Sequence, residues 1–253
     1  MAIDLNADVG EAIGDDEGVL PFVSSANVAC GFHAGNPTIM RSTVQLAHGL
    51  GVAIGAHPSF EDREGFGRRE MQLGAADLER LVAYQIGALA GVAGALGIRL
   101  SHVKPHGALY NMAIRDRALS DAIAAAIASF DRSLILFALP GTELMNAGKA
   151  AGLQVAAEGF ADRSYEADGS LTPRTRSGAV IHNADEAIGR AIRMARDGVV
   201  RAVNGSDIPM RVDTICTHGD TPGSNELTRQ LRAALEAAGI EVKPIGPRRT
   251  TDA

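Results

Sequence analysis

The stretch SSANVACGFHAGNP, residues 24–37, decides the fold of this chain. Its first half is small and apolar enough to form a buried strand, and its second half is a glycine-flanked turn that carries His33. Asn36 followed by Pro37 is typical of a helix start, since asparagine caps free N–H groups and proline needs none at the first helical position. Polar groups at the C-terminal ends of strands are where α/β barrels and open α/β sheets keep their chemistry.

The same order of strand, polar turn and helix recurs along the chain. Strand character is found in residues 3–9, 25–30, 52–56, 100–103, 134–138, 153–157 and 212–216. Helices are expected over residues 37–48, 77–96, 120–130, 142–151, 183–196 and 225–238. Ser120 is the expected cap of the third of these helices. Such strand–helix units with short connections are typical of a parallel sheet.

We therefore predict an α/β fold in which about seven parallel strands close into an irregular TIM-like (β/α) barrel. Closure is favoured because polar residues follow nearly every strand and would converge on one mouth. An open doubly wound sheet is the alternative, since periodicity does not separate the two. One domain is expected over residues 1–253, with a disordered tail near residues 250–253.

The composition is that of an ordinary globular protein, with 253 residues of which 46% are hydrophobic and 21% charged. A formal net charge of -6 argues against nucleic acid as a partner. The two cysteines, Cys30 and Cys216, are too few for a disulfide framework and are expected to be buried free thiols.

The longest uncharged stretch, residues 81–98, contains Tyr84 and several glycines. Such a segment suits a closely packed helix better than a membrane span. Packing onto the barrel is the simpler explanation of its small residues, and a contact in a homo-oligomer is the alternative. The N-terminal residues show no leader pattern, so we expect a cytoplasmic protein with no membrane partner.

Polar side chains stand at or just past the ends of the predicted strands. They are Asp8, Glu11, His33, His57, Lys104, His106, Glu158, Arg163, His218 and Asp220. Taken singly, each has a structural explanation as a turn residue or a helix cap. Gathered at one end of one fold, they indicate a catalytic site.

Three of these residues suggest a metal site. Asp8, His33 and His57 follow the first three strands, and a mixed set of carboxylate and imidazole ligands suits a divalent transition metal. The alternative is a hydrogen-bonded network without metal.

Two further segments suggest anion binding. Lys104, in a closed pocket, could bind an anion or act as a base if its pKa were lowered; the alternative is a lysine at the barrel rim. The loop at residues 65–69, which includes Arg68, offers N–H groups and guanidinium to phosphate or carboxylate. No Walker A motif is found, so ATP would not bind this chain in a standard P-loop.

Together, the motifs of this chain resemble those of the LamB/YcsF family. The motifs that carry the resemblance lie at residues 4–11, 25–35, 54–58, 65–69, 103–111, 158–165, 168–174 and 216–222. The resemblance implies an irregular TIM-like barrel of the glycoside hydrolase/deacetylase type. It also implies opening of the 5-oxoproline lactam to L-glutamate, coupled to ATP hydrolysis with partner subunits B and C. Deacetylase relatives use an Asp/His metal site, which favours a divalent metal here.

The expected roles follow from this chemistry. Catalysis is assigned to Asp8, Glu11, His57, Lys104, His106 and Glu158, with Asp8 or Glu158 as the base and the two histidines as proton carriers. Binding of the small-molecule substrate is assigned to Asn6, Arg68, Arg163, His218 and Asp220. The alternatives are a metal-dependent deacetylase of an N-acetylated carbohydrate, a hydrolase of another cyclic amide, and a non-catalytic scaffold.

Overall fold

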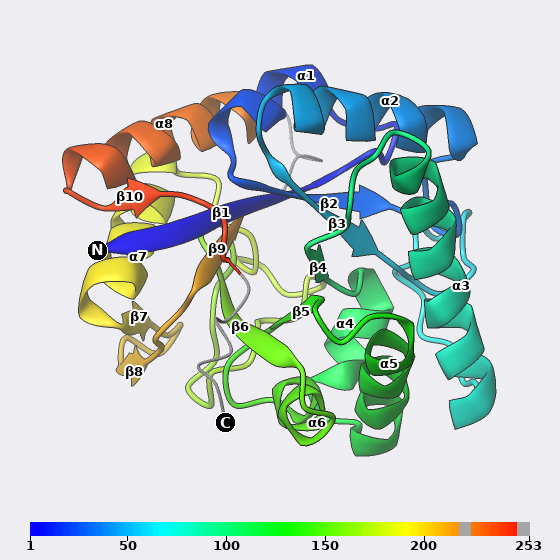
Figure 1. The fold of residues 1–253 in the computed structure, drawn as a ribbon. Coiled ribbons are helices and arrows are strands. Elements are labelled where there is room, and N and C mark those ends of the chain that lie inside the picture. The colour runs from blue at the N-terminus through cyan, green and yellow to red at the C-terminus, as the bar shows by residue number, and fades with distance from the viewer. Residues whose placement is uncertain (218–223, 247–253) are drawn as a thin grey trace, which may run out of the picture.

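Seven parallel strands form a closed ring in the computed structural model, which describes residues 1–217 and 224–246 (Figure 1). The ring consists of β1 (Ala2–Val9), β2 (Ser25–Ala29), β3 (Ala53–His57), β4 (His102–Val103), β5 (Ile135–Ala138), β6 (Gln154–Phe160) and β9 (Thr214–Thr217). Each strand pairs with the next, and β9 pairs with β1 to close the barrel. A short strand, β10 (Glu241–Val242), adds to β1 outside the ring. The predicted barrel is confirmed.

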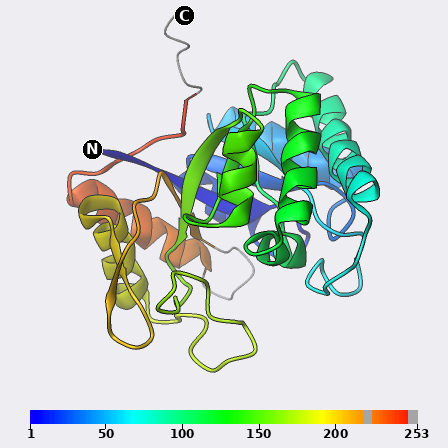
Figure 2. The same cartoon turned by 90° about the horizontal axis from the view of Figure 1, so that it is seen from below.

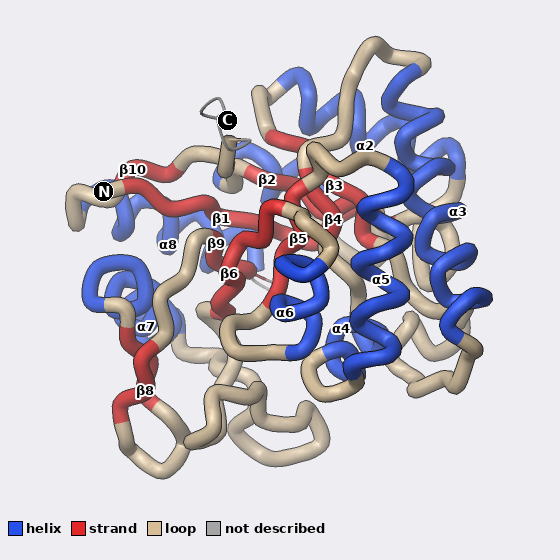
Figure 3. Tube along the Cα trace, turned by 60° about the horizontal axis from the view of Figure 1, so that its bottom comes forward, coloured by secondary structure: helices blue, strands red, loops and turns tan. Residues whose placement is uncertain are grey.

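Helices surround this ring, as Figures 1 and 3 show. They are α1 (Asp16–Val19), the 3-10 helix η1 (Leu20–Phe22), α2 (Pro37–Gly49), α3 (Ala75–Gly94), α4 (Gly107–Ala113), α5 (Arg117–Phe130), α6 (Glu143–Ala150), α7 (Ala184–Asp197) and α8 (Ser224–Ala237). After α7, β7 (Val199–Arg201) and β8 (Asp207–Pro209) pair as a separate antiparallel hairpin (Figure 2). None of the helices in the described ranges has the length and hydropathy that a membrane span requires.

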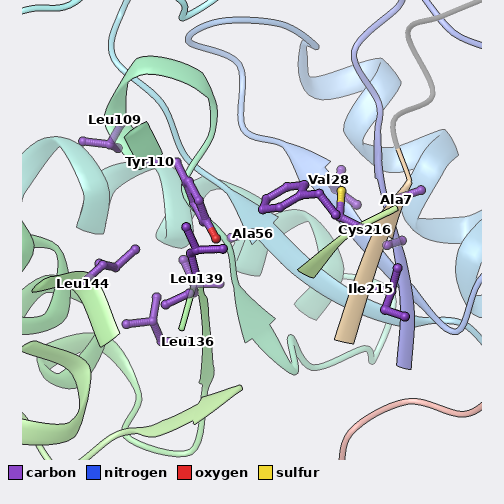
Figure 4. Close-up of a cluster of buried hydrophobic side chains, with 14 of the residues drawn as sticks. Ala7, Val28, Ala56, Leu109, Tyr110, Leu136, Leu139, Leu144, Ile215 and Cys216 are labelled. Atoms are coloured by element: carbon purple, nitrogen blue, oxygen red, sulfur yellow. The ribbon is translucent and has the colours of Figure 1, made fainter. Parts of the chain in front are cut away.

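Side chains of β1 alternate between two environments, because successive residues of a strand point to opposite faces. Leu5, Ala7 and Val9 belong to the hydrophobic core between strands and helices. Figure 4 shows part of this core, in which Leu136 of β5 lies near Leu144 of α6. On the other face of β1, Asp4 makes polar contacts with the neighbouring strands β2 and β9.

Asp4 ties three strands together near the closure of the ring. Its carboxylate accepts hydrogen bonds from Ser24 and Ser25 at the start of β2, at 2.6 and 2.7 Å, and from Thr214 of β9 at 2.5 Å. Burial raises the pKa of Asp4, although these three hydroxyl donors oppose that shift. The closure therefore depends on a satisfied polar network as well as on the backbone ladder.

Helix caps agree with the sequence at α2 and differ at α5. Asn36 accepts a hydrogen bond from the Ile39 N–H at 3.0 Å, as predicted. The prediction of Ser120 as a cap is wrong, because α5 begins a turn earlier and Asp116 accepts from the Leu119 N–H. Ser120 is buried and donates to the Ala113 carbonyl. The hairpin, α4 and β10 were not predicted.

Cys30 and Cys216 are buried free thiols, as predicted. The uncharged stretch forms most of α3, which packs against α5. The expected disordered tail lies outside the described residues, and the single-domain boundary stays a prediction.

We expect Asp116→Ala to lower the free energy of unfolding by about 1 kcal/mol, because it removes the cap of α5. Urea denaturation followed by circular dichroism measures the change. Asp121→Ala is the matched control: it removes an exposed carboxylate that pairs with Arg117 on the same helix, at a cost below about 0.5 kcal/mol. Equal losses in the two variants would contradict the assigned cap.

Candidate active site

A cavity of about 540 Å³ opens at the C-terminal ends of the barrel strands. Its lining includes Asp8 of β1, His57 of β3 and Phe160 of β6, together with residues of the following loops. Lys104 and His106 reach it from the turn after β4. Because parallel strands present their C-terminal ends at the same mouth, residues far apart in sequence meet there.

Four buried side chains form a compact cluster at this mouth: Glu11, His33, His57 and His106. One ligand atom of each lies within 4.8 Å of those of the others. His33 Nε2 is 3.2 Å from Glu11 Oε1, and His106 Nδ1 is 3.4 Å from the same oxygen. His57 Nε2 lies 2.9 Å from His106 Nδ1. Three imidazoles and one carboxylate are a set of ligands that transition metals prefer.

Main-chain carbonyls fix the tautomers of two of these rings. His57 Nδ1 donates to the Lys104 carbonyl at 2.7 Å, and His106 Nε2 donates to the Phe66 carbonyl at 2.9 Å. A carbonyl only accepts, so each outer nitrogen carries the hydrogen and each inner nitrogen of the neutral ring presents a lone pair. The inner nitrogens of His57 and His106 lie 2.9 Å apart, so either one of them carries a proton that the other accepts, or a cation lies beside both. Histidines that ligate a metal commonly donate their other ring hydrogen to a carbonyl in this way.

Burial also favours the neutral, ligating form of two of the rings. It lowers the pKa of His33 to about 2, with a further contribution from the charge of His57. It lowers the pKa of His106 well below its ordinary value, with His33 and His57 acting in the same direction. Both rings are therefore unprotonated at neutral pH.

The loop between β3 and α3, which contacts His106 through Phe66 and Gly67, contains close backbone approaches. Gly67 has φ +66°, and a Cβ there would collide with the side chains of Ser59, His33 and His106. Phe66, at φ 56°, adopts a left-handed conformation that is strained for a bulky residue. That conformation accompanies the hydrogen bond from His106 to the Phe66 carbonyl, so the strain is associated with the site.

Lys104 is the centre of a second, deeper network. Its ammonium group contacts Asp8 Oδ1 at 2.9 Å, Glu158 Oε1 at 3.0 Å, Asn6 Oδ1 at 3.2 Å and Cys216 Sγ at 3.0 Å. Burial alone would lower the pKa of Lys104, but the charges of Asp8, Cys216 and Glu158 raise it well above its ordinary value. Lys104 is thus a fixed cation, and the suggestions of a base with a lowered pKa or a rim lysine are wrong.

Glu158 and Asn6 lie below the cavity. Strand β6 continues to Phe160, beyond its predicted end, so that Glu158 lies within the strand and not after it. Its side chain is fully buried and pairs with Lys104. Asn6 donates to Thr214 and Glu158 and accepts from Lys104. Both residues hold the lysine, and neither lines the cavity within the described part of the chain.

The predicted substrate-binding residues have different surroundings. Arg163 lines the cavity, but its guanidinium donates to the Thr172 and Ala179 carbonyls at 2.7 and 3.2 Å. Burial lowers the pKa of Arg163 to about 10. Arg163 thereby holds the polar loop that follows β6, whereas Arg68 reaches the cavity with its guanidinium over the Phe66 ring. His218 and Asp220 lie outside the described residues.

The cluster differs from the predicted metal set of Asp8, His33 and His57. Asp8 Oδ2 is 3.3 Å from His57 Nε2, but Asp8 Oδ1 binds Lys104 and Asn27. Glu11 and His106, expected to act in catalysis, complete the four-residue group instead. Sequence reasoning missed Tyr110, a buried cavity residue whose pKa is raised by burial and by the charge of Glu158. Tyr110 lies in the family motif at residues 103–111, just after the predicted strand at residues 100–103, and this position was the signal that could have identified it.

A parallel (β/α) barrel with buried histidines, carboxylates and a lysine at its mouth defines a barrel enzyme of the hydrolytic type. The sequence matches the LamB/YcsF family over residues 3–250, and the chain belongs to that family.

Individual relatives agree with this assignment. A protein of Methylococcus capsulatus, named as the A subunit of 5-oxoprolinase, is 55% identical over 249 residues, covering 96% of this chain and 96% of the relative. A Bacillus subtilis protein of the same name is 50% identical over 254 residues, covering 98% and 99%. The crystal structure of a lactam utilization protein from Thermus thermophilus matches with a TM-score of 0.93 and 48% identity, covering 97% of this chain and 100% of that one.

Lys104→Met is expected to lower the free energy of unfolding by about 3 kcal/mol or more, since it leaves Asp8 and Glu158 buried without their cation. Urea denaturation measures the loss. The double variant Lys104→Met/Glu158→Gln should recover part of the stability, because one of the two uncompensated charges is gone. Additive losses in the double variant would show that the pair is not coupled.

Proposed function

We propose that this chain opens the lactam ring of 5-oxoproline to give L-glutamate, in a reaction coupled to ATP hydrolysis with partner subunits B and C. The carrying observation is the buried cluster of Glu11, His33, His57 and His106 beside Asp8 at the barrel mouth. Membership of the LamB/YcsF family and the names of its relatives support the choice of a lactam.

The reaction sets three demands on the site. Water must add to the lactam carbonyl carbon, the ring C–N bond must break, and the leaving nitrogen must gain a proton. A base that takes a proton from water, a donor for the nitrogen and a stabiliser for the oxyanion are therefore needed.

Asp8 is our candidate for the base. Its carboxylate lines the cavity, while Lys104 at 2.9 Å and Asn27 at 2.8 Å hold Oδ1 from below. Oδ2 faces the histidine cluster, 3.3 Å from His57 Nε2. Glu158 is the weaker candidate because it is fully buried beneath Lys104.

Glu11, His33, His57 and His106 would hold one divalent transition-metal ion. The donor set fits, since both outer nitrogens of His57 and His106 are already bound to carbonyls, which is the usual outer shell of a ligating histidine. A metal held there supplies Lewis-acid polarisation of an amide carbonyl and of water.

Arg68 is our candidate for the substrate carboxylate. It lines the cavity beside the cluster, and its guanidinium is stacked 5.0 Å from the centre of the Phe66 ring. Arg163, also predicted to bind substrate, instead donates to main-chain carbonyls. We assign ATP use to the partner subunits, in keeping with the sequence, which lacks a P-loop motif.

Deacetylation of an N-acetylated carbohydrate is the second candidate, because it too cleaves an amide with a metal and a carboxylate. An extended sugar site is typically lined by exposed aromatic rings. The aromatic residues that line this cavity, within the described chain, are Tyr110 and Phe160, and each is only 4% exposed. This favours a compact cyclic amide.

Glutamate release from 5-oxoproline tests the function. We expect release with both partner subunits and ATP, and none from the chain alone. Asp8→Asn should lower the rate by about 100-fold or more, because a base is lost, while circular dichroism stays unchanged. Asp77→Asn, which alters an exposed carboxylate of α3 paired with Arg80, is the control. Full activity of Asp8→Asn would remove Asp8 from the mechanism, and no release by the assembled subunits would overturn the function.

Metal binding is tested separately from activity. Chelator-treated protein titrated with Co²⁺ should bind about one equivalent per chain, seen by visible absorption. Glu11→Gln and His106→Ala should each abolish this binding, whereas His48→Ala, which removes an exposed histidine of α2, should not. Stoichiometric binding by both cluster variants would contradict the ligand set.

A further inference from the structure

A second hollow lies away from the barrel mouth, between α7 and the β7–β8 hairpin. It is a groove of about 520 Å³, and its lining within the described chain shares no residue with the mouth cavity. Figures 1 and 2 show α7 and the hairpin side by side at one flank of the barrel, far from α3. This groove is not used by the proposed reaction.

Three arginines line the groove: Arg190 and Arg193 from α7, and Arg201 from β7. Among the described residues, Glu186 is the one carboxylate in the lining. Asp207 of β8 is shared between two of the arginines, at 2.8 Å from Arg193 and 3.3 Å from Arg201. On a chain with a net charge of -6, this is a local excess of positive charge.

Arg190 is the most buried of the three, and its guanidinium lies 6.0 Å from the centre of the Tyr165 ring. Its side chain is only 11% exposed, and its nearest described carboxylate oxygen, in Glu186, is 3.8 Å away. One amino group donates to the Arg201 carbonyl at 2.9 Å, which holds the guanidinium in place, but its Nε has no hydrogen-bond acceptor among the described residues. A buried guanidinium is costly unless an anion pairs with it.

Apart from Ser164, which donates to the Gly178 carbonyl, the remaining side chains of the lining are apolar. Val200 and Ala202 are buried in its floor, and Val203 at its edge is 52% exposed. A ligand here would therefore meet several guanidiniums on one side and aliphatic carbon on the other.

We infer that this groove binds a phosphate group. A planar carboxylate pairs with one guanidinium fork, whereas a tetrahedral phosphate accepts hydrogen bonds from several guanidiniums at once. The phosphate comes either as the inorganic ion or as a phosphate monoester whose organic part rests on Val203. The inference is independent of the lactam reaction.

Isothermal titration of the full chain with inorganic phosphate, at constant ionic strength, tests the site. Saturable binding is expected, and Arg201→Gln should weaken it by roughly tenfold. Arg190→Gln should abolish phosphate binding. Because Arg190 is buried, this variant could fail to fold, and Arg201→Gln, which changes an exposed side chain, then provides the test. Arg196→Gln, which removes an exposed arginine of α7 paired with Asp197, should bind like wild type.

Two comparisons separate the outcomes. Glycerol 3-phosphate binding more tightly than inorganic phosphate would assign the groove to a monoester, and equal or weaker binding would assign it to the inorganic ion. Arg68→Gln, in the mouth cavity, should keep the binding. Loss of binding in Arg68→Gln but not in Arg201→Gln would place the phosphate at the mouth and overturn the inference, as would an absence of saturable binding in wild type.

Discussion

The ammonium group of Lys104 is the interaction on which the centre of the barrel depends. It lies between Asp8 of β1 and Glu158 of β6, so that one cation neutralises carboxylates from different strands. The main-chain carbonyl of the same residue accepts the Nδ1 hydrogen of His57. One residue thus fixes both the charge balance below the cavity and the orientation of a ring above it. Buried ions are tolerated only when paired and hydrogen-bonded, and the ammonium group of Lys104 meets both conditions.

The interior of this barrel is therefore polar where many barrels are apolar. Asn6, Asn27 and His102 form a hydrogen-bonded chain that supports Lys104 and Asp8. Stability has to come from the outer layer, where the hydrophobic core lies between strands and helices. Because of this separation, the inner face of the strands can carry the polar residues of the candidate site, while the outer face buries the apolar surface that drives folding.

The residues of the mouth could be predicted from sequence because strand ends are visible as apolar runs that stop at glycine or proline. His33, His57 and His106 were identified in this way. That His106 and Glu11 join His33 and His57 could not be predicted. The orientation of the rings depends on the carbonyls of Phe66 and Lys104, and a sequence does not show which main-chain carbonyl a side chain will reach. The mistaken lysine base has the same origin, since a pKa depends on which carboxylates lie nearby after folding.

Main-chain acceptors fix the orientation of the His57 and His106 rings more firmly than side-chain acceptors would. A side-chain acceptor can change rotamer, but the Phe66 carbonyl moves only if the loop changes its backbone conformation. That loop is held by Gly67, where any Cβ would collide with His33 and His106. The strain at Phe66 and the glycine beside it are then two parts of one constraint, which sets the inner nitrogen of His106 against that of His57. A site whose ligands are positioned by backbone is preorganised before any substrate binds, which is where an enzyme lowers the cost of reaching its transition state.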